Sequence, residues 1–106
     1  MTLADQLASS LGERSQLPNK ALGAEIVRSQ DKAALNEIRE LISENQKLAV
    51  LGDALKVVEI MGELDSAFTK EAIDQILPLL DHPSNKIQWR AMSALSTIAR
   101  HHTKLL

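Results

Sequence analysis

The apolar residues of this chain repeat at an interval of 37 positions, and this repetition limits the folds that the chain can adopt. The pairs superimposed by the shift are Ile87 with Val50, Ala91 with Ala54, Met92 with Leu55, Ala94 with Val57, Leu95 with Val58, Ile98 with Met61 and Ala99 with Gly62. An offset of 38 superimposes three residues of the preceding segments, Leu35, Ile38 and Ile42, on Ile73, Ile76 and Leu80. A period of this length indicates helical hairpins that stack on one another.

The composition favours a single all-helical domain. A chain of 106 residues is long enough for one modest hydrophobic core, and we expect one domain over residues 1–106. Four glycines, three prolines and no tyrosine argue against a β-rich fold, because hairpin turns use glycine and strands favour aromatic residues. The sequence therefore predicts an all-α fold of about five to six helices.

Apolar periodicity and capping residues set the expected helix boundaries. The predicted helical segments are 2–12, 19–29, 31–45, 46–64, 65–80 and 84–100. Asp65, Ser66 or Thr69 is expected to begin the fifth segment, and Ser84 or Asn85 to cap the last. Pro18 disfavours a helical Leu17, so we expect a loop over 13–18 and a helix capped by Asn19. Asp31 is the expected cap of the next helix. Pro78 should kink the segment 65–80, because proline lacks an amide donor and clashes with the preceding turn.

Two apolar stripes define the expected buried faces of the paired segments. In 31–45 the stripe consists of Leu35, Ile38, Leu41 and Ile42, and in 65–80 it consists of Ile73, Ile76, Leu77 and Leu80. The segment 46–64 is apolar on more than one face, which predicts a helix packed between neighbours. In the last segment the expected buried residues are Ile87, Ala91, Ala94, Leu95 and Ile98.

Residues 71–100 resemble a HEAT repeat, and more broadly an armadillo-type helical repeat. The resemblance rests on Leu77-Pro78-Leu79-Leu80, on the turn Asp81-His82-Pro83, and on Ile87 with Ala91, Ala94 and Leu95. The chain has Gln88 where many such repeats have arginine, and the earlier turn, residues 43–46, lacks the Asp-x-Pro motif. The resemblance implies an α-α superhelix of stacked antiparallel hairpins, with amino-terminal helices in 1–30 and repeats in 31–65 and 66–104.

An ordinary globule of five or six helices, with a coincidental repeat, is the alternative to that superhelix. The two folds differ in the position of their first helix. A solenoid stacks its hairpins in chain order, whereas a bundle brings the first helix back against the last.

In HEAT-like proteins the second helix of each hairpin usually lines the concave surface, and this predicts where a partner would bind. The residues expected on that ridge are Lys56, Glu59, Glu63, Trp89, Arg90, Ser93, Ser96 and Arg100. We expect Gly52 to continue the ridge, and Asp53, Ile60 and Thr97 to flank it. An exposed tryptophan beside an arginine is typical of protein contact centres. The alternative is that the Trp89 indole folds over the adjacent helix turn or covers Pro83 and Pro78.

No residue pattern indicates catalysis, a cofactor or a metal site. The chain has no cysteine, and His101 and His102 are adjacent, so on a regular helix their side chains point about 100° apart. His82 has no third ligand nearby in the sequence, and Ser93, Ser96 and Thr97 have no histidine at helical spacing. A phosphate-binding glycine-rich loop is also missing from the sequence. We expect a protein that is not an enzyme.

Charge and hydropathy favour a soluble, cytoplasmic protein. The net charge is −2, and the predicted ridge mixes acidic and basic residues, whereas a nucleic-acid groove is predominantly basic. No apolar run reaches the length of a membrane span, and the first residues, MTLADQLASSLGER, do not resemble a signal peptide. Because the predicted ridge is not predominantly basic, a protein or peptide is the favoured partner.

Three functions remain open from the sequence. The favoured one is a non-catalytic protein-interaction or scaffold module that binds its partner on the concave face. A second is a nucleic-acid-associated HEAT-like protein related to DNA alkylation repair, for which Trp89, Arg90 and Arg100 are the supporting residues. The third is a structural role, either as a segment of a longer repeat array or as a homodimer that buries the terminal hairpin, because residues 101–106 contain no polar capping helix.

Overall fold

Every regular element in the described part of the chain is helical. The computed structural model describes residues 6–7, 16–44 and 47–99. Its elements are α1 (Leu17–Ser29), α2 (Lys32–Glu44), α3 (Leu48–Leu64), α4 (Ser66–Thr69), η2 (Lys70–Ala72), α5 (Ile73–Ile76), η3 (Leu77–Asp81) and α6 (Asn85–Ala99). This confirms the predicted all-α class. The helix expected over 2–12 and the residues Arg100, His101 and His102 lie wholly or mostly outside the described part.

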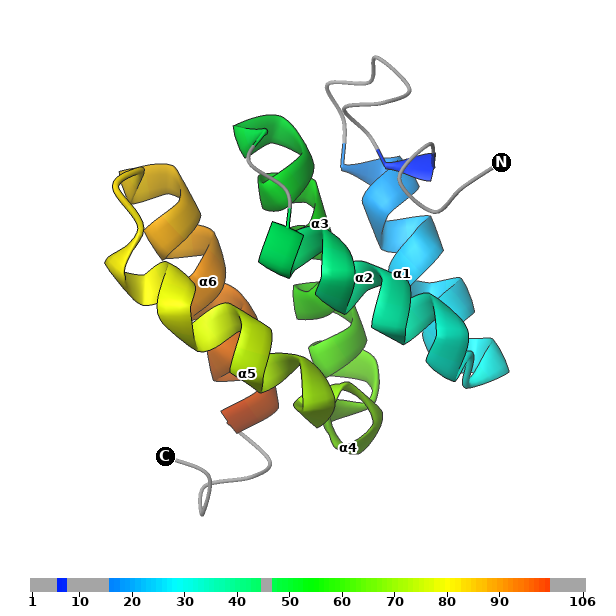
Figure 1. Cartoon of the computed structure of the whole chain (residues 1–106). Helices are drawn as coiled ribbons and strands as arrows, with labels where there is room; N and C mark the ends of the chain where they lie inside the picture. The colour runs from blue at the N-terminus through cyan, green and yellow to red at the C-terminus, as the bar shows by residue number, and fades with distance from the viewer. Residues whose placement is uncertain (1–5, 8–15, 45–46, 100–106) are drawn as a thin grey trace.

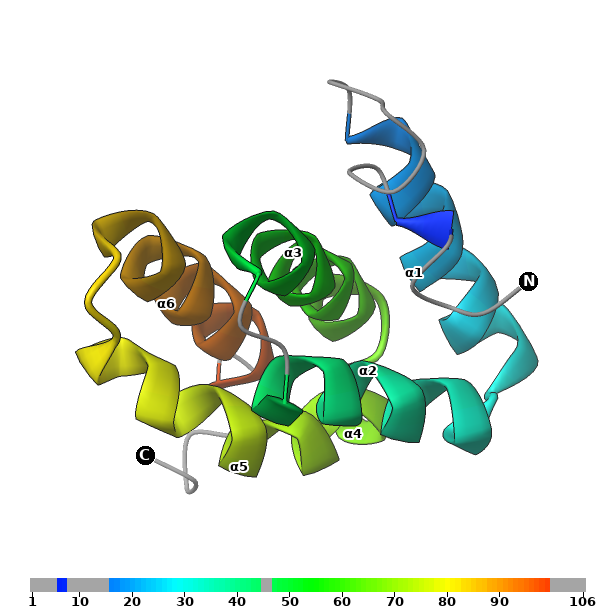
Figure 2. The same ribbon diagram turned by 45° about the horizontal axis from the view of Figure 1, so that its top comes forward.

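The helices form two layers (Figures 1 and 2). One layer contains α1, α3 and α6, which run in the same direction, with α3 packed against both neighbours. The second layer contains α2 and the segment from α4 to η3, and the smallest dimension of the molecule, 22 Å, corresponds to two helix diameters. The hairpins α2–α3 and α5–α6 therefore follow one another in chain order, and α1 and α6 lie at opposite edges.

The first described helix begins earlier than predicted. α1 starts at Leu17, and Pro18 occupies its first turn. Proline is compatible with that turn because its missing amide hydrogen would have no partner inside the helix. Asn19 is therefore a buried residue of the helix and not its cap. The left-handed residue Gln30 (φ 51°) ends α1, and its amide donates to the carbonyl of Val27 over 3.1 Å.

Three predicted capping residues begin their helices as expected. Asp31 Oδ1 accepts a hydrogen bond from the Ala34 amide at 3.0 Å, and Asp65 Oδ1 accepts one from the Phe68 amide at 3.1 Å. Ser84 Oγ accepts a longer one, 3.4 Å, at the start of α6. Each cap satisfies an amide that has no partner within its own helix.

The segment around Pro78 is helical but changes its winding. α5 ends at Ile76, and residues 77–81 form the 3₁₀ helix η3. A 3₁₀ helix has three residues per turn, so Leu79 follows Ile76 on the core side, and Leu77 and Leu80 share another side. The prediction that Leu77 and Leu80 belong to the buried stripe is therefore wrong: their exposed fractions are 44% and 37%.

The core contains nearly all the other residues predicted for it. Leu35, Ile38 and Ile42 of α2 are buried, and so are all five residues predicted for α6. Met92 departs from the repeat, because it is 56% exposed although its counterpart Leu55 is fully buried. The reason is that α3 lies between two helices, whereas α6 has a neighbour in its layer on one side only.

Two glycines allow close approach within the α1–α3–α6 layer. A Cβ on Gly23 would lie 3.1 Å from Ile60 Cβ, and a Cβ on Gly62 would overlap Thr97 Oγ1 and lie 3.2 Å from Ile98 Cγ1. Thr97 is the repeat counterpart of Ile60, 37 positions later. Both helix contacts thus place a glycine against the same position of the repeat.

We expect Gly62→Ala to destabilise the fold and Gly52→Ala not to do so. Overpacking costs about 1–3 kcal/mol, which exceeds the roughly 1 kcal/mol by which alanine favours a helix over glycine. Gly52 is the matched control on the same helix, because its added Cβ would meet only Ile87 Cδ1, at 3.9 Å. Urea unfolding should show a net loss of up to about 2 kcal/mol for Gly62→Ala. Equal stability of the two variants would contradict the proposed close contact.

Candidate interaction surface

The structure brings the predicted ridge residues together on two neighbouring helices. Lys56, Glu59 and Glu63 lie on α3, and Trp89, Arg90, Ser93 and Ser96 lie on α6, which packs beside it. Arg100 lies outside the described residues. Glu63, Trp89 and Ser96 are exposed, and the other ridge residues are half-buried.

Trp89 is the most exposed large apolar residue of the ridge. Its exposed fraction is 70%, so most of the indole faces solvent and is not covered by the turn at Pro83. Trp89 lies in the second turn of α6, near the amino-terminal end of that helix. A tryptophan offers a large rigid apolar area with one hydrogen-bond donor, which suits contact with a partner.

The charges of the ridge are partly paired with each other. Lys56 Nζ lies 2.6 Å from Glu59 Oε2, and both side chains are largely shielded from solvent. Within the described part of the chain, Glu63 and Arg90 have no ion-pair partner. The ridge thus offers one acidic group, one basic group and an indole, together with the small hydroxyl side chains of α6.

Three residues predicted on the ridge or beside it are buried instead. Gly52 faces Ile87 of α6, and Thr97 faces Gly62 and donates from Oγ1 to the carbonyl of Ala94 over 2.7 Å. Asp53 is covered on the side of α1. These corrections share one cause: α3 packs against α1 on one side and against α6 on the other, and each of the three residues lies in one of these contacts.

A buried polar contact joins α1 to α3, and sequence reasoning missed it. Asn19 Nδ2 donates to Asp53 Oδ1 over 2.9 Å, and also to Gln16 Oε1 over 2.8 Å. Asn19 is fully buried. Its position after Pro18 suggested a helix cap, and no sequence signal linked it to a carboxylate 34 residues away. Because a buried carboxylate needs donors, the asparagine helps to fix how the two helices meet.

We expect Asn19→Ala to lower the free energy of unfolding by about 1–3 kcal/mol, because it leaves a buried carboxylate oxygen without this donor. The matched control is Asn36→Ala, since Asn36 is an exposed asparagine whose side chain accepts a 3.2 Å hydrogen bond from Arg39. That control should change stability by less than about 0.5 kcal/mol. Chemical denaturation measures both values, and similar values for the two variants would contradict the assigned role.

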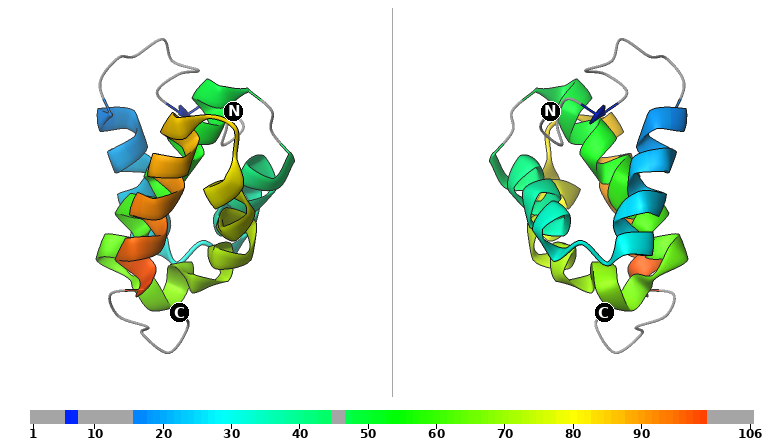
Figure 3. Two further views of the ribbon diagram at one scale, coloured as in Figure 1. Left: turned by 90° about the vertical axis from the view of Figure 1, so that its left-hand side faces the viewer. Right: turned by 90° about the vertical axis from the view of Figure 1, so that its right-hand side faces the viewer.

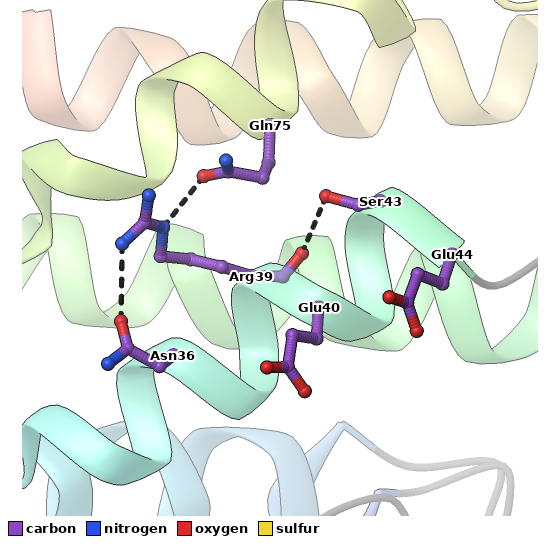
Figure 4. Close-up of a pocket in the computed structure, with 6 residues that line it drawn as sticks. All are labelled: Asn36, Arg39, Glu40, Ser43, Glu44 and Gln75. Atoms are coloured by element: carbon purple, nitrogen blue, oxygen red, sulfur yellow. Dashed lines mark hydrogen bonds between the residues drawn. The ribbon is translucent and has the colours of Figure 1, made fainter.

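The second layer carries a polar hollow of about 320 Å³ between α2 and α5 (Figure 4). Arg39 Nε donates to Gln75 Oε1 over 2.8 Å and thereby links the two helices. Glu40 and Glu44 also line the hollow but point away from this pair. Beside the hollow, Lys32 of α2 lies 3.1 Å from Glu71 of η2.

Of the polar groups that line the hollow, Arg39 and Gln75 join the two hairpins. In the part of the chain that the structure describes, no buried side-chain nitrogen or oxygen lacks a hydrogen-bond partner. No three histidine, aspartate or glutamate residues converge on a metal position among these same residues.

His82 takes part in two hydrogen bonds in the turn that precedes α6. Its Nδ1 accepts from the Ser84 amide at 2.9 Å, and its backbone carbonyl accepts from Gln88 Nε2 at 2.6 Å. Both contacts stabilise the turn before α6.

None of the described helices combines the length and the apolar character needed to cross a bilayer. No protein-family model matches the chain, and no curated protein or solved structure is significantly similar to it.

Proposed function

We propose that this protein is a non-catalytic interaction module of HEAT-like architecture that binds a protein or peptide on the ridge of α3 and α6. The observation that carries the proposal is the 70% exposure of Trp89 on a helix whose other large apolar residues are mostly buried. Exposed aromatic residues beside small polar ones are a composition that protein interfaces favour.

The arrangement of the helices supports the HEAT-like part of the proposal. The hairpins α2–α3 and α5–α6 stack in chain order, and both helix contacts of the α1–α3–α6 layer place a glycine against the same position of the repeat. A bundle would instead bring α1 back to α6. Gln88 bonds to the His82 carbonyl, so this side chain stabilises the turn at the position where many HEAT repeats have arginine.

The charges of the ridge favour a polypeptide over a nucleic acid. The ammonium group of Lys56 is paired with Glu59, and the ridge carries the acidic Glu63 as well as the basic Arg90. A phosphate backbone is bound by an excess of uncompensated basic groups.

We include a cytoplasmic location in the proposal, since the absence of cysteine suits a reducing compartment.

We expect Trp89→Ala to weaken partner binding without unfolding the protein. Truncating a contact tryptophan typically costs 2 kcal/mol or more of binding free energy, roughly a 30-fold loss of affinity. The stability should change by less than about 0.5 kcal/mol, because the indole is mostly exposed. A large drop in the thermal midpoint would instead assign Trp89 a role in the fold.

Photo-crosslinking in cells identifies the surface and the class of partner together. A photoreactive amino acid at Ser93 should give protein adducts, and Trp89→Ala should reduce their yield. The same amino acid at Asn36, on the second layer, is the control and should give few. Equal adducts from both positions, or adducts with nucleic acid alone, would overturn the proposed partner class.

A further inference from the structure

One edge of the molecule is formed by α6 together with α5 and η3, and we call it the α5–α6 edge (Figure 3, left). Several of its apolar side chains are exposed. Met92 of α6 is 56% exposed, and Leu77 and Leu80 of η3 are 44% and 37% exposed. Ile73 of α5 is half-buried. Apolar side chains that face water on two adjacent helices are typical of a surface that contacts another molecule.

The internal repeat shows what kind of contact this edge is built for. Gly52 and Gly62 of α3 both face α6, and Leu55 lies on the same face of α3, where it is fully buried. Met92 is the counterpart of Leu55 on α6. The exposed side of α6 thus corresponds to the side of α3 that packs against the next helix of the layer.

At the opposite edge the outermost helix of the α1–α3–α6 layer is α1 (Figure 3, right), and its exposed side chains are of a different kind. Its exposed residues include Lys20, Glu25 and Arg28. The Arg28 guanidinium donates from Nε to Glu25 over 2.8 Å and lowers the pKa of that carboxyl. A head-to-tail stack of copies would bury these charged groups against the apolar α5–α6 edge, which is unfavourable.

We propose that the α5–α6 edge is a homodimer interface, in which two copies meet through the same edge. The exposed apolar side chains of a second copy match those of the first, because Ile73, Leu77, Leu80 and Met92 carry no charge. Contact between identical surfaces is isologous and closes at two copies. This inference is independent of the proposed partner on the ridge.

The positions of the exposed side chains fit a two-fold axis through the middle of the edge. Met92 is the central residue of α6, and Leu77 is the central residue of the segment 73–81. If the axis lies in the interface and is perpendicular to both helices, α6 packs against α6 of the second copy in antiparallel orientation. Met92 then lies against Met92 of the second copy, and Leu77 against its counterpart.

The size of the edge sets the expected strength of the dimer. α6 has 15 residues and is about 22 Å long, and the molecule is 22 Å thick, so the edge covers roughly 500 Å². Standard interfaces bury about 800 Å² on each partner. We therefore expect a weak, concentration-dependent dimer that forms at tens to hundreds of micromolar, roughly 5–6 kcal/mol of association free energy.

Disulfide crosslinking tests the central contact directly, because the chain has no cysteine of its own. Met92→Cys should form a covalent dimer under mild oxidation, since residues at a two-fold axis come within the Cα separation of about 4.4–6.8 Å that a disulfide requires. The control is Leu48→Cys, whose parent residue is 51% exposed at the start of α3. Crosslinking at least several-fold faster at position 92 supports the interface, and equal rates overturn it.

Sedimentation velocity over a concentration series provides a second, non-covalent measurement. The unmodified chain should shift from monomer towards dimer, and Met92→Glu and Leu77→Glu should each remain monomeric with unchanged circular dichroism. Leu17→Glu, a change at an exposed leucine of α1, should still dimerise. A parent chain that stays monomeric up to about 1 mM overturns the proposal. A monomeric Met92→Glu variant that still gives protein adducts from Ser93 leaves the ridge function intact.

Discussion

The fold depends on the contacts that α3 makes on both of its sides. Gly23 of α1 and Gly62 of α3 have no side chain at positions where an added Cβ would lie 3.1 Å or less from atoms of the neighbouring helix, so that each pair of helices can pack closely. Because dispersion contacts weaken steeply with distance, this approach allows the apolar residues between the helices to fill the layer without voids. The positions of α1 and α6, and hence of the ridge and both edges, follow from these two contacts.

The second layer is joined across its hairpins in a different way. The residues that link α2 to the α4–η3 segment are partly exposed and polar: Arg39 with Gln75, and Lys32 with Glu71. Lys32 also lies 5.1 Å from the centre of the Phe68 ring. Exposed ion pairs contribute about 0–1 kcal/mol each, so these contacts fix the orientation of the hairpins more than they stabilise the fold.

Much of the fold could be predicted from local pattern, whereas contacts between distant residues could not. The 3.6-residue periodicity identified the buried faces of α2 and α6, and side-chain oxygens at Asp31 and Asp65 identified two helix starts. Periodicity failed at Leu80, because it assumes one winding and η3 has another.

The candidate site shows the same division. The exposure of Trp89 followed from its place opposite the buried face of α6. Asp53 and Thr97 were misplaced because their burial is caused by neighbouring helices, whose positions the sequence does not state. The polar contacts of Asn19 and Arg39 join residues about 35 positions apart, and a single sequence holds no signal for them.

The first half of the last hairpin is divided into short helical segments: α4, η2, α5 and η3 each have five residues or fewer. This stretch should therefore open locally at a lower free energy than the continuous helix α3. Amide hydrogen exchange in residues 66–81 would then slow when a second copy covers Leu77 and Leu80. The exchange rate of this segment would therefore measure how far the protein has associated.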